Sequence, residues 1–109
     1  MDVFKGPEFD LLSIKFKNIL FESEFTIRSN SRMAYNLDEK AQIGIKSIIS
    51  SPVMPGSVQL TPSGKIIILH RDCQTIGAYP RILQLDTNSL NNLSQLKSND
   101  KIKFSLITQ

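Results

Sequence analysis

The residues best suited to chemistry gather between positions 72 and 81 of the 109-residue chain. Asp72, Gln74 and Thr75 supply a carboxylate, a carboxamide and a hydroxyl within four positions. Gly77 follows them and lets the backbone turn tightly and present its N–H group. Donors and acceptors placed in this way suit the recognition of an amide, a ureido group or a carboxylate. We therefore expect a binding site for a small polar ligand in this segment.

Three further residues extend the candidate site. Tyr79 offers an aromatic face with a polar tip, and Arg81 can hold a carboxylate through two parallel hydrogen bonds. Arg32 lies near Tyr35 in the sequence and is a candidate for the entrance of the same binding site. A solvated position on a strand is the simpler interpretation of Arg32. No catalytic residue can be assigned. The predicted substrate-binding residues are Asp72, Gln74, Thr75, Gly77, Tyr79, Arg81 and Arg32.

A purely structural role of the same segment is the competing interpretation. Asp72 and Thr75 would then cap backbone N–H groups, and Gln74 would bridge neighbouring strands. Both interpretations stay open, because one loop can serve both purposes. We expect His70 to be structural, since it is a lone histidine at the end of a strand. We expect Cys73 to pack rather than react, since no base lies nearby in the sequence.

The overall composition is that of an ordinary globular protein, with 40% hydrophobic and 21% charged residues. The formal net charge of +3 is mild and scattered, so neither nucleic acid nor a membrane surface is expected as a partner. The chain has one cysteine, so no intrachain disulfide can form. With one cysteine and one histidine, we expect no metal site. No apolar run approaches the ~18 residues of a membrane span, and the first residues lack the layout of a signal peptide. We expect a cytoplasmic location.

The elements that must position the candidate site are mostly strands. Two strand-like runs, 57–60 and 65–69, flank Thr61-Pro62-Ser63-Gly64, which is a strong hairpin signal, and Pro55-Gly56 precedes them as a turn. The pattern also predicts strands at 2–5, 24–28, 32–37, 81–85 and 101–107, and a helix at 8–20. A short helix capped by Asp86 or Thr87 follows the strand at 81–85, and 98–100 is a turn in which Asn99 can take the left-handed conformation.

Residues 38–47 read as a long connection that can include one short strand, and Ile48-Ile49 is a brief apolar patch. Because the strands are not separated by regular helices, a parallel α/β sheet is disfavoured. The predicted fold class is mainly β, a closed antiparallel or mixed β-barrel capped by two short helices.

Two stretches together carry a family resemblance. Residues 56–65, Gly-Ser-Val-Gln-Leu-Thr-Pro-Ser-Gly-Lys, and residues 72–82, Asp-Cys-Gln-Thr-Ile-Gly-Ala-Tyr-Pro-Arg-Ile, resemble the C-terminal part of the allophanate hydrolase subunit 2 family. The family pattern is a G-x-(I/V)-Q hairpin followed by D-x-Q-T-(T/I)-G-G-Y-P-(K/R)-(I/V). Segments 31–37 and 99–104 and the opening Gly6-Pro7 agree with it as well. Ala34 and Ala78 stand where the pattern has Gly, and Ser98-Asn99 replaces Pro-Gly.

The resemblance implies a fold and a function. The family includes the C subunit of 5-oxoprolinase and the carboxyltransferase region of urea carboxylase, and its fold in this region is cyclophilin-like. Residues 1–109 would form a single domain, the C-terminal part of a longer protein. The implied activity is ATP-dependent opening of 5-oxoproline to glutamate, or carboxyl transfer from biotin. ATP or biotin would act in the full complex, with neither cofactor bound by this segment.

The resemblance also implies partners. These are a first-subunit homologue of the Kip inhibitor or allophanate hydrolase subunit 1 type, and a small amide substrate. We expect no turnover by the chain alone. An alternative of another class is a regulatory protein that antagonises a Kip-type histidine kinase inhibitor. Peptidyl-prolyl isomerisation rests on fold analogy alone, and no isomerase motif supports it.

Overall fold

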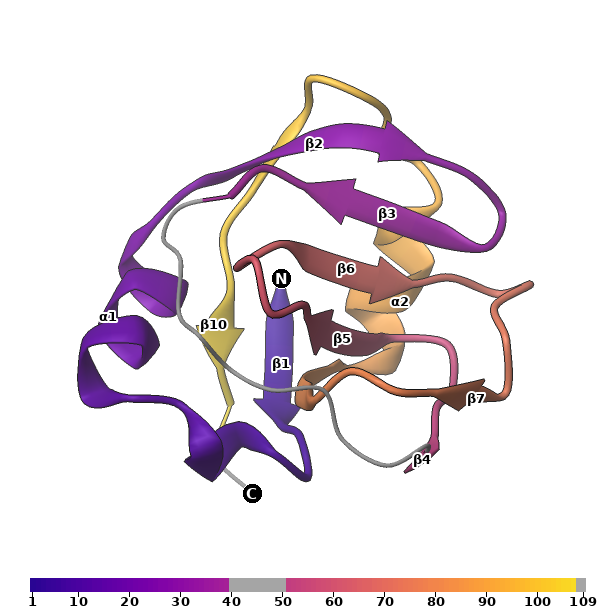
Figure 1. Ribbon diagram of the computed structural model, residues 1–109. Helices are drawn as coiled ribbons and strands as arrows, with labels where there is room; N and C mark the ends of the chain where they lie inside the picture. The colour runs from indigo at the N-terminus through magenta and orange to yellow at the C-terminus, as the bar shows by residue number, and fades with distance from the viewer. Residues whose placement is uncertain (40–50, 108–109) are drawn as a thin grey trace.

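The computed structural model describes residues 1–39 and 51–107 and is built mainly of β-strands (Figure 1). Eight strands form one curled sheet in the order β10-β1-β8-β5-β6-β3-β2-β9, and β4 and β7 form a separate two-stranded ribbon. The elements in chain order are β1 (Asp2–Lys5), the 3-10 helix η1 (Phe9–Leu11), α1 (Ile14–Glu22), β2 (Phe25–Asn30), β3 (Ala34–Leu37), β4 (Ser51–Pro52), β5 (Ser57–Leu60), β6 (Ile66–Leu69), β7 (Ile76–Gly77), β8 (Arg81–Leu85), α2 (Thr87–Leu93), β9 (Lys101–Ile102) and β10 (Ser105–Leu106).

The sheet is open, so the predicted closure of the barrel is wrong. Its two edge strands, β9 and β10, come from the single run 101–107 that the alternation predicts as one strand. Lys101–Ile102 pairs antiparallel with β2, and after Phe104 the chain crosses to pair in parallel with β1. Each of these short edge strands therefore pairs with one neighbour. No backbone pairing joins β9 to β10, so the described strands do not close into a barrel. The mainly β class with two short helices is confirmed, whereas the cyclophilin-like character stays a prediction.

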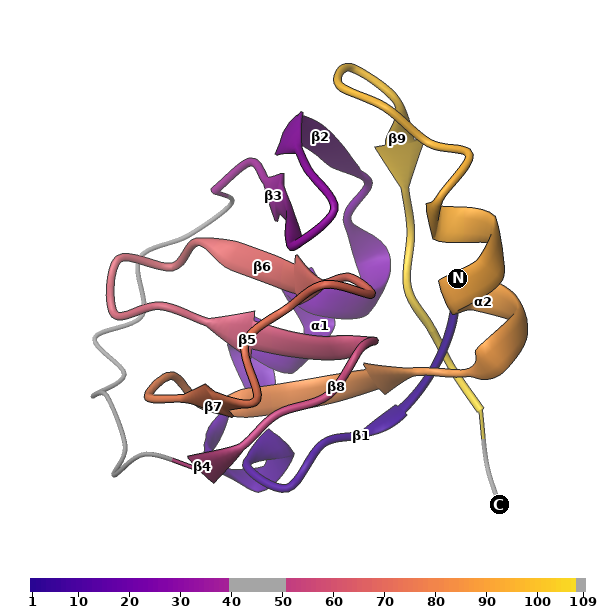
Figure 2. The same ribbon diagram turned by 90° about the vertical axis from the view of Figure 1, so that its right-hand side faces the viewer.

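The core lies between the sheet and the two helices. Val58 and Leu60 of β5 are fully buried and pack in one cluster with Phe16 and Leu20 of α1 and Leu93 of α2. Figure 2 shows α1 behind the sheet and the β4–β7 ribbon on the opposite side, in front of the start of β8. Because side chains alternate along a strand, the other residues of β5 face this ribbon. They are buried as well, so the sheet is covered on both faces at β5.

The helix predicted over 8–20 is two elements, and this is a correction. Leu12 is extended with ψ 141°, and Ser13 then caps α1 by accepting a hydrogen bond from the Phe16 N–H at 3.1 Å. The cause lies upstream, where the Gly6 and Glu8 N–H groups donate to carbonyls of β8 at 2.9 and 3.0 Å. These bonds hold the chain along the sheet, so a regular helix begins only after Leu12.

The predicted turns are confirmed. Gly64 closes the β5–β6 hairpin with φ 91°, Gly56 has φ 90°, and Asn99 has φ 79°. Asp86 caps α2 by accepting a hydrogen bond from the Ser89 N–H at 2.8 Å. The strands β4 and β7 were not predicted. Most of the expected connection 38–47 and the patch at 48–49 lie outside the described residues. No helix in the described part of the chain is long and apolar enough to cross a membrane.

Candidate functional site

The loop between β6 and β8 is held by backbone hydrogen bonds against the face of the sheet opposite α1, which we call the outer face. The His70 N–H donates to the Met33 carbonyl, and the Asp72 N–H donates to the Arg32 carbonyl, both at 2.9 Å. Further along, the Thr75 carbonyl accepts from Val53 at 3.0 Å, and β7 pairs antiparallel with β4. The loop is therefore anchored at its start to the residues just before β3, and near its end to β4 and Val53.

A pocket of about 180 Å³ lies beneath this loop, on the outer face of the sheet. Its walls are mainly apolar and include Val53, Ile67, Leu69 and Ile76, whereas Gln59 and Gln74 bring carboxamides to it. An apolar cavity of about 150 Å³ is large enough to take up benzene. The pocket therefore has room for a ligand with one five- or six-membered ring.

Gln59 is the unusual member of this pocket. It sits in β5, is 5% exposed, and its Nε2 donor has no hydrogen-bond partner among the described residues. A register shift between Val58 and Gln59 interrupts the ladder with β8, and such irregularities re-aim the neighbouring side chain. A buried donor without a partner costs about 1–3 kcal/mol. A ligand that brings an acceptor into the pocket would satisfy this donor.

Gly77 is required because there is no room for a side chain at this position. This role differs from the turn-forming role that the sequence suggests. Its φ lies outside the left-handed region, as does that of Ala78. A Cβ atom at Gly77 would lie 2.5 Å from Gln59 Nε2 and 3.2 Å from Val53 Cγ1. The missing side chain lets β7 lie directly against the Gln59 carboxamide. Ala78 in place of the family's Gly therefore introduces no strain of the left-handed kind.

Two of the seven predicted site residues, Gln74 and Gly77, line the pocket. Asp72 and Arg32 meet each other instead, with the Arg32 Nε 2.9 Å from Asp72 Oδ2 and both side chains largely exposed. The Thr75 backbone carbonyl accepts the hydrogen bond from the Val53 N–H next to β4. The Tyr79 side chain is 37% exposed. The direct ligand contacts expected of Asp72, Thr75, Tyr79 and Arg32 stay predictions.

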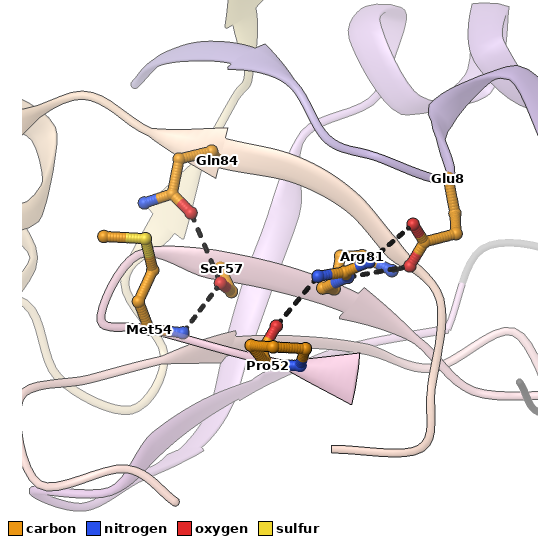
Figure 3. A network of polar contacts seen from close by, with 6 residues as sticks. All are labelled: Glu8, Pro52, Met54, Ser57, Arg81 and Gln84. Carbon is orange, nitrogen blue, oxygen red and sulfur yellow. Dashed lines mark hydrogen bonds and ion pairs between the residues drawn. The ribbon is translucent and has the colours of Figure 1, made fainter. Parts of the chain in front are cut away.

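Arg81 is engaged by a carboxylate of the chain itself. Glu8 receives hydrogen bonds from Arg81 Nε at 2.8 Å and Nη2 at 2.9 Å, and Nη1 donates to the Pro52 carbonyl at 2.9 Å (Figure 3). The bidentate geometry expected of Arg81 is thus present, with Glu8 as the partner. The side-chain hydrogen bond from Arg81 holds the pKa of Glu8 below its ordinary value, and the same bond raises the pKa of Arg81. This pair ties the start of the chain to β8 and β4.

His70 and Cys73 occupy packed positions. The His70 ring is 9% exposed and meets the Tyr35 ring edge-on, with the centroids 5.4 Å apart. Burial raises the pKa of the Cys73 thiol, which lowers its thiolate fraction near neutral pH. Both observations agree with the structural roles expected from the sequence. No group of three or more metal-ligating side chains is found among residues 1–39 and 51–107.

The sequence reasoning missed Gln59 as a site residue. Two signals were available, because Gln59 stands between the apolar residues Val58 and Leu60 and is also the glutamine of the G-x-(I/V)-Q pattern. A polar residue in a strand that is buried on both faces needs a partner or a ligand. The burial of the outer face became visible only with β4 and β7, which are too short for periodicity to reveal.

Comparisons with known proteins agree with this fold. The chain is 33% identical over 107 residues to the C subunit of 5-oxoprolinase from Haemophilus influenzae, a match covering 94% of this chain and 34% of that protein. It is 29% identical over 102 residues to the corresponding 5-oxoprolinase protein of Escherichia coli, covering 91% and 33%. The chain thus spans about a third of the length of these curated relatives.

Solved structures share the architecture. The K. lactis urea amidolyase superposes with a TM-score of 0.87 at 17% identity, covering 99% of this chain and 7% of that one. The protein TTHA0988 superposes with a TM-score of 0.83 at 24% identity, covering 95% and 20%. The family model described as "Carboxyltransferase domain, subdomain A and B" matches residues 1–106. On this match over nearly its whole length, the chain belongs to the carboxyltransferase domain family.

Proposed function

We propose that this chain forms the amide-binding portion of a 5-oxoprolinase-type enzyme. The observation that carries the proposal is a ring-sized, mainly apolar pocket with a buried carboxamide that has no partner among the described residues. A small cyclic amide such as 5-oxoproline matches it in size and polarity, because its ring methylenes are apolar and its amide is a neutral hydrogen-bonding group. The names of the curated relatives support the same substrate.

Catalytic turnover would require an assembly larger than this chain. Because the chain spans about a third of its relatives, ATP-dependent ring opening or biotin-dependent carboxyl transfer would need the remaining two-thirds and a first-subunit homologue of the Kip inhibitor or allophanate hydrolase subunit 1 type. The chain's own contribution is to hold the amide and to exclude water from one side of it. Alone, it is expected to bind 5-oxoproline without converting it.

Isothermal titration of the purified chain with 5-oxoproline, urea and biotin tests the proposal. We expect saturable binding of 5-oxoproline, weaker binding of urea because it lacks the apolar ring, and no binding of biotin. Binding of biotin alone would favour carboxyl transfer and contradict the lactam assignment. Conversion of 5-oxoproline by the isolated chain would contradict its dependence on a larger assembly.

Co-purification with a first-subunit homologue separates an enzyme part from a regulatory antagonist. Gln59→Met removes the pocket carboxamide without changing the surface. An enzyme part is expected to keep the complex and to lose 5-oxoprolinase activity in the reconstituted assembly. A complex that forms with the wild-type chain and shows no 5-oxoprolinase activity would indicate a purely regulatory surface.

A further inference from the structure

The Gln59 carboxamide can present both a donor and an acceptor to the pocket. Its Nε2 is buried and unpartnered in the described part of the chain, and its side chain forms part of the pocket wall. The terminal torsion of glutamine is broad, so the amide can turn about its last bond while the backbone stays in place. A turn of this kind brings the N–H donors or the carbonyl to the cavity.

The surroundings of Gln59 define which ligand chemistry fits. Val53, Ile67, Leu69 and Ile76 are apolar, and the nearby cation of Arg32 is exposed and bound to Asp72. A carboxylate placed beside Gln59 would lose its hydration without gaining a cation, which is strongly unfavourable. A neutral amide in the same place loses much less hydration and gains hydrogen bonds. The pocket therefore favours the uncharged end of a ligand.

The arrangement of the carbonyl and N–H in a cyclic amide allows a carboxamide to recognise it. Its peptide-like bond is held cis by the ring, so the carbonyl oxygen and the N–H lie side by side on one edge. The Gln59 carboxamide has the complementary arrangement, with Nε2 as the donor and Oε1 as the acceptor. Two antiparallel hydrogen bonds can form between the two groups. An open-chain trans amide presents its carbonyl and N–H on opposite sides and can form only one of them.

Gly77 leaves this carboxamide the space that it needs to turn. A Cβ atom at position 77 would lie 2.5 Å from Gln59 Nε2, so any side chain there would press on the carboxamide and limit its rotation. The contact is with the end of a flexible side chain and not with backbone, so the fold is expected to tolerate Ala at this position.

We propose that Gln59 determines specificity by pairing with the cis-amide edge of a cyclic ligand, with Gly77 leaving the room that this pairing needs. This inference rests on the proposed function, and it adds which end of the ligand enters the pocket. The ring amide lies inward against Gln59, and any carboxylate of the ligand points toward the mouth and solvent.

Ligand pairs test the orientation. Titrations monitored by NMR compare 5-oxoproline, 2-pyrrolidinone, N-methyl-2-pyrrolidinone and cyclopentanecarboxylate on the full chain. We expect 5-oxoproline and 2-pyrrolidinone to bind, and N-methylation to weaken binding by ~10-fold or more because one hydrogen bond is lost. Cyclopentanecarboxylate keeps the acid and lacks the amide, so binding as tight as that of 5-oxoproline would overturn the inference.

Variants test the residue. Gln59→Met and Gly77→Ala are each expected to weaken 2-pyrrolidinone binding by ~10-fold or more, and Gln95→Met, an exposed glutamine outside the pocket, to leave it unchanged. Gln59→Met should also raise the unfolding temperature, since it removes a buried unpaired donor, whereas a structural glutamine would lower it.

The outcomes separate the two proposals. If wild-type chain binds no lactam, the proposed function fails. If lactams bind and both Gln59→Met and Gly77→Ala bind them equally well, the proposed function stands and the role of Gln59 is wrong.

Discussion

At the scale of single residues, the Glu8–Arg81 pair has the clearest electrostatic signature. The side chains are 14% and 20% exposed, so the pair is largely removed from solvent. The pKa of Glu8 is lower in the folded protein than its ordinary value of 4.5, chiefly because Arg81 donates to the carboxylate. Its stabilising effect is therefore complete above the unfolded pKa and is lost as the pH falls through the lower folded value.

Glu8→Gln is expected to lower the free energy of unfolding by about 1–2 kcal/mol at pH 7, because it leaves the partly buried Arg81 charge without its counterion. It should also flatten the loss of stability between pH 5 and pH 3, since the carboxyl that takes up a proton is gone. Urea unfolding at pH 7, 5 and 3 measures both effects.

The matched control is Glu24→Gln, which removes the exposed ion pair with Lys101, both side chains being 61% exposed. Its effect at pH 7 should stay below about 1 kcal/mol. If the Glu8→Gln protein loses stability with acid as steeply as the wild type does, Glu8 is not the group responsible.

At the scale of elements, α1 begins where Ser13 caps it. The Ser13 hydroxyl accepts from the Phe16 N–H, so Ser13→Ala should lower the free energy of unfolding by about 1 kcal/mol. Ser13→Asp keeps an acceptor at the positive end of the helix and should restore most of this loss. Chemical unfolding of the three proteins compares them directly. Equal losses for Ala and Asp would show that the cap contributes nothing.

The turn before β9 depends on Asn99, which has φ 79°. An alanine side chain in this left-handed conformation is disfavoured by about 1–2 kcal/mol, whereas glycine adopts it freely. Asn99→Ala should therefore destabilise the protein and Asn99→Gly should not, as thermal unfolding of both variants can measure. Asn99→Ala with wild-type stability would mean that the turn does not hold this conformation in solution.

The elements also show where sequence reasoning succeeds and fails. The hairpin of β5 and β6 was predictable because Pro62 and Gly64 act within four residues of each other. The break at Leu12 was not, because the stripe of Phe9, Leu12 and Phe16 fits a helix, while the bonds from Gly6 and Glu8 to β8 are tertiary. Along the predicted strand 101–107, regular alternation would bury Ile102, Phe104 and Leu106 on one face. Ile102 and Phe104 are buried, but Leu106 is 41% exposed because the chain changes neighbours after Phe104.

The same distinction applies to the candidate site. The segment from Asp72 to Gly77 was predictable from its dense polar residues, and it does cover a pocket. The internal engagement of Arg81 was not, since its partner Glu8 lies 73 residues away in the sequence. Gln59 was hidden for a similar reason, because the ribbon that buries it comes from two distant dipeptides.

At the scale of the whole molecule, the fold separates stability from binding. The core side of the sheet packs against α1 and α2, and the β4–β7 ribbon lies on the opposite side (Figure 2). The pocket is on the side of this ribbon and is lined in part by Ile76 and Gly77 of β7. Changes at the pocket should therefore alter ligand binding with little loss of stability, and changes at Glu8, Ser13 or Asn99 should do the reverse. A protein of this family can thus vary its ligand while keeping the same scaffold.

The central claim is that a small cyclic amide binds beside Gln59, in the pocket that Gln74 and Gly77 also line. A two-dimensional NMR titration of the ¹⁵N-labelled chain with 5-oxoproline tests it most directly, because the backbone amides and the Gln side-chain NH₂ groups are observed separately. The account predicts saturable shifts of the Gln59 side-chain NH₂ and of the Gln74 and Gly77 backbone amides, with α1 and α2 unaffected. Saturable shifts confined to another face, or no shifts at millimolar ligand, would contradict it.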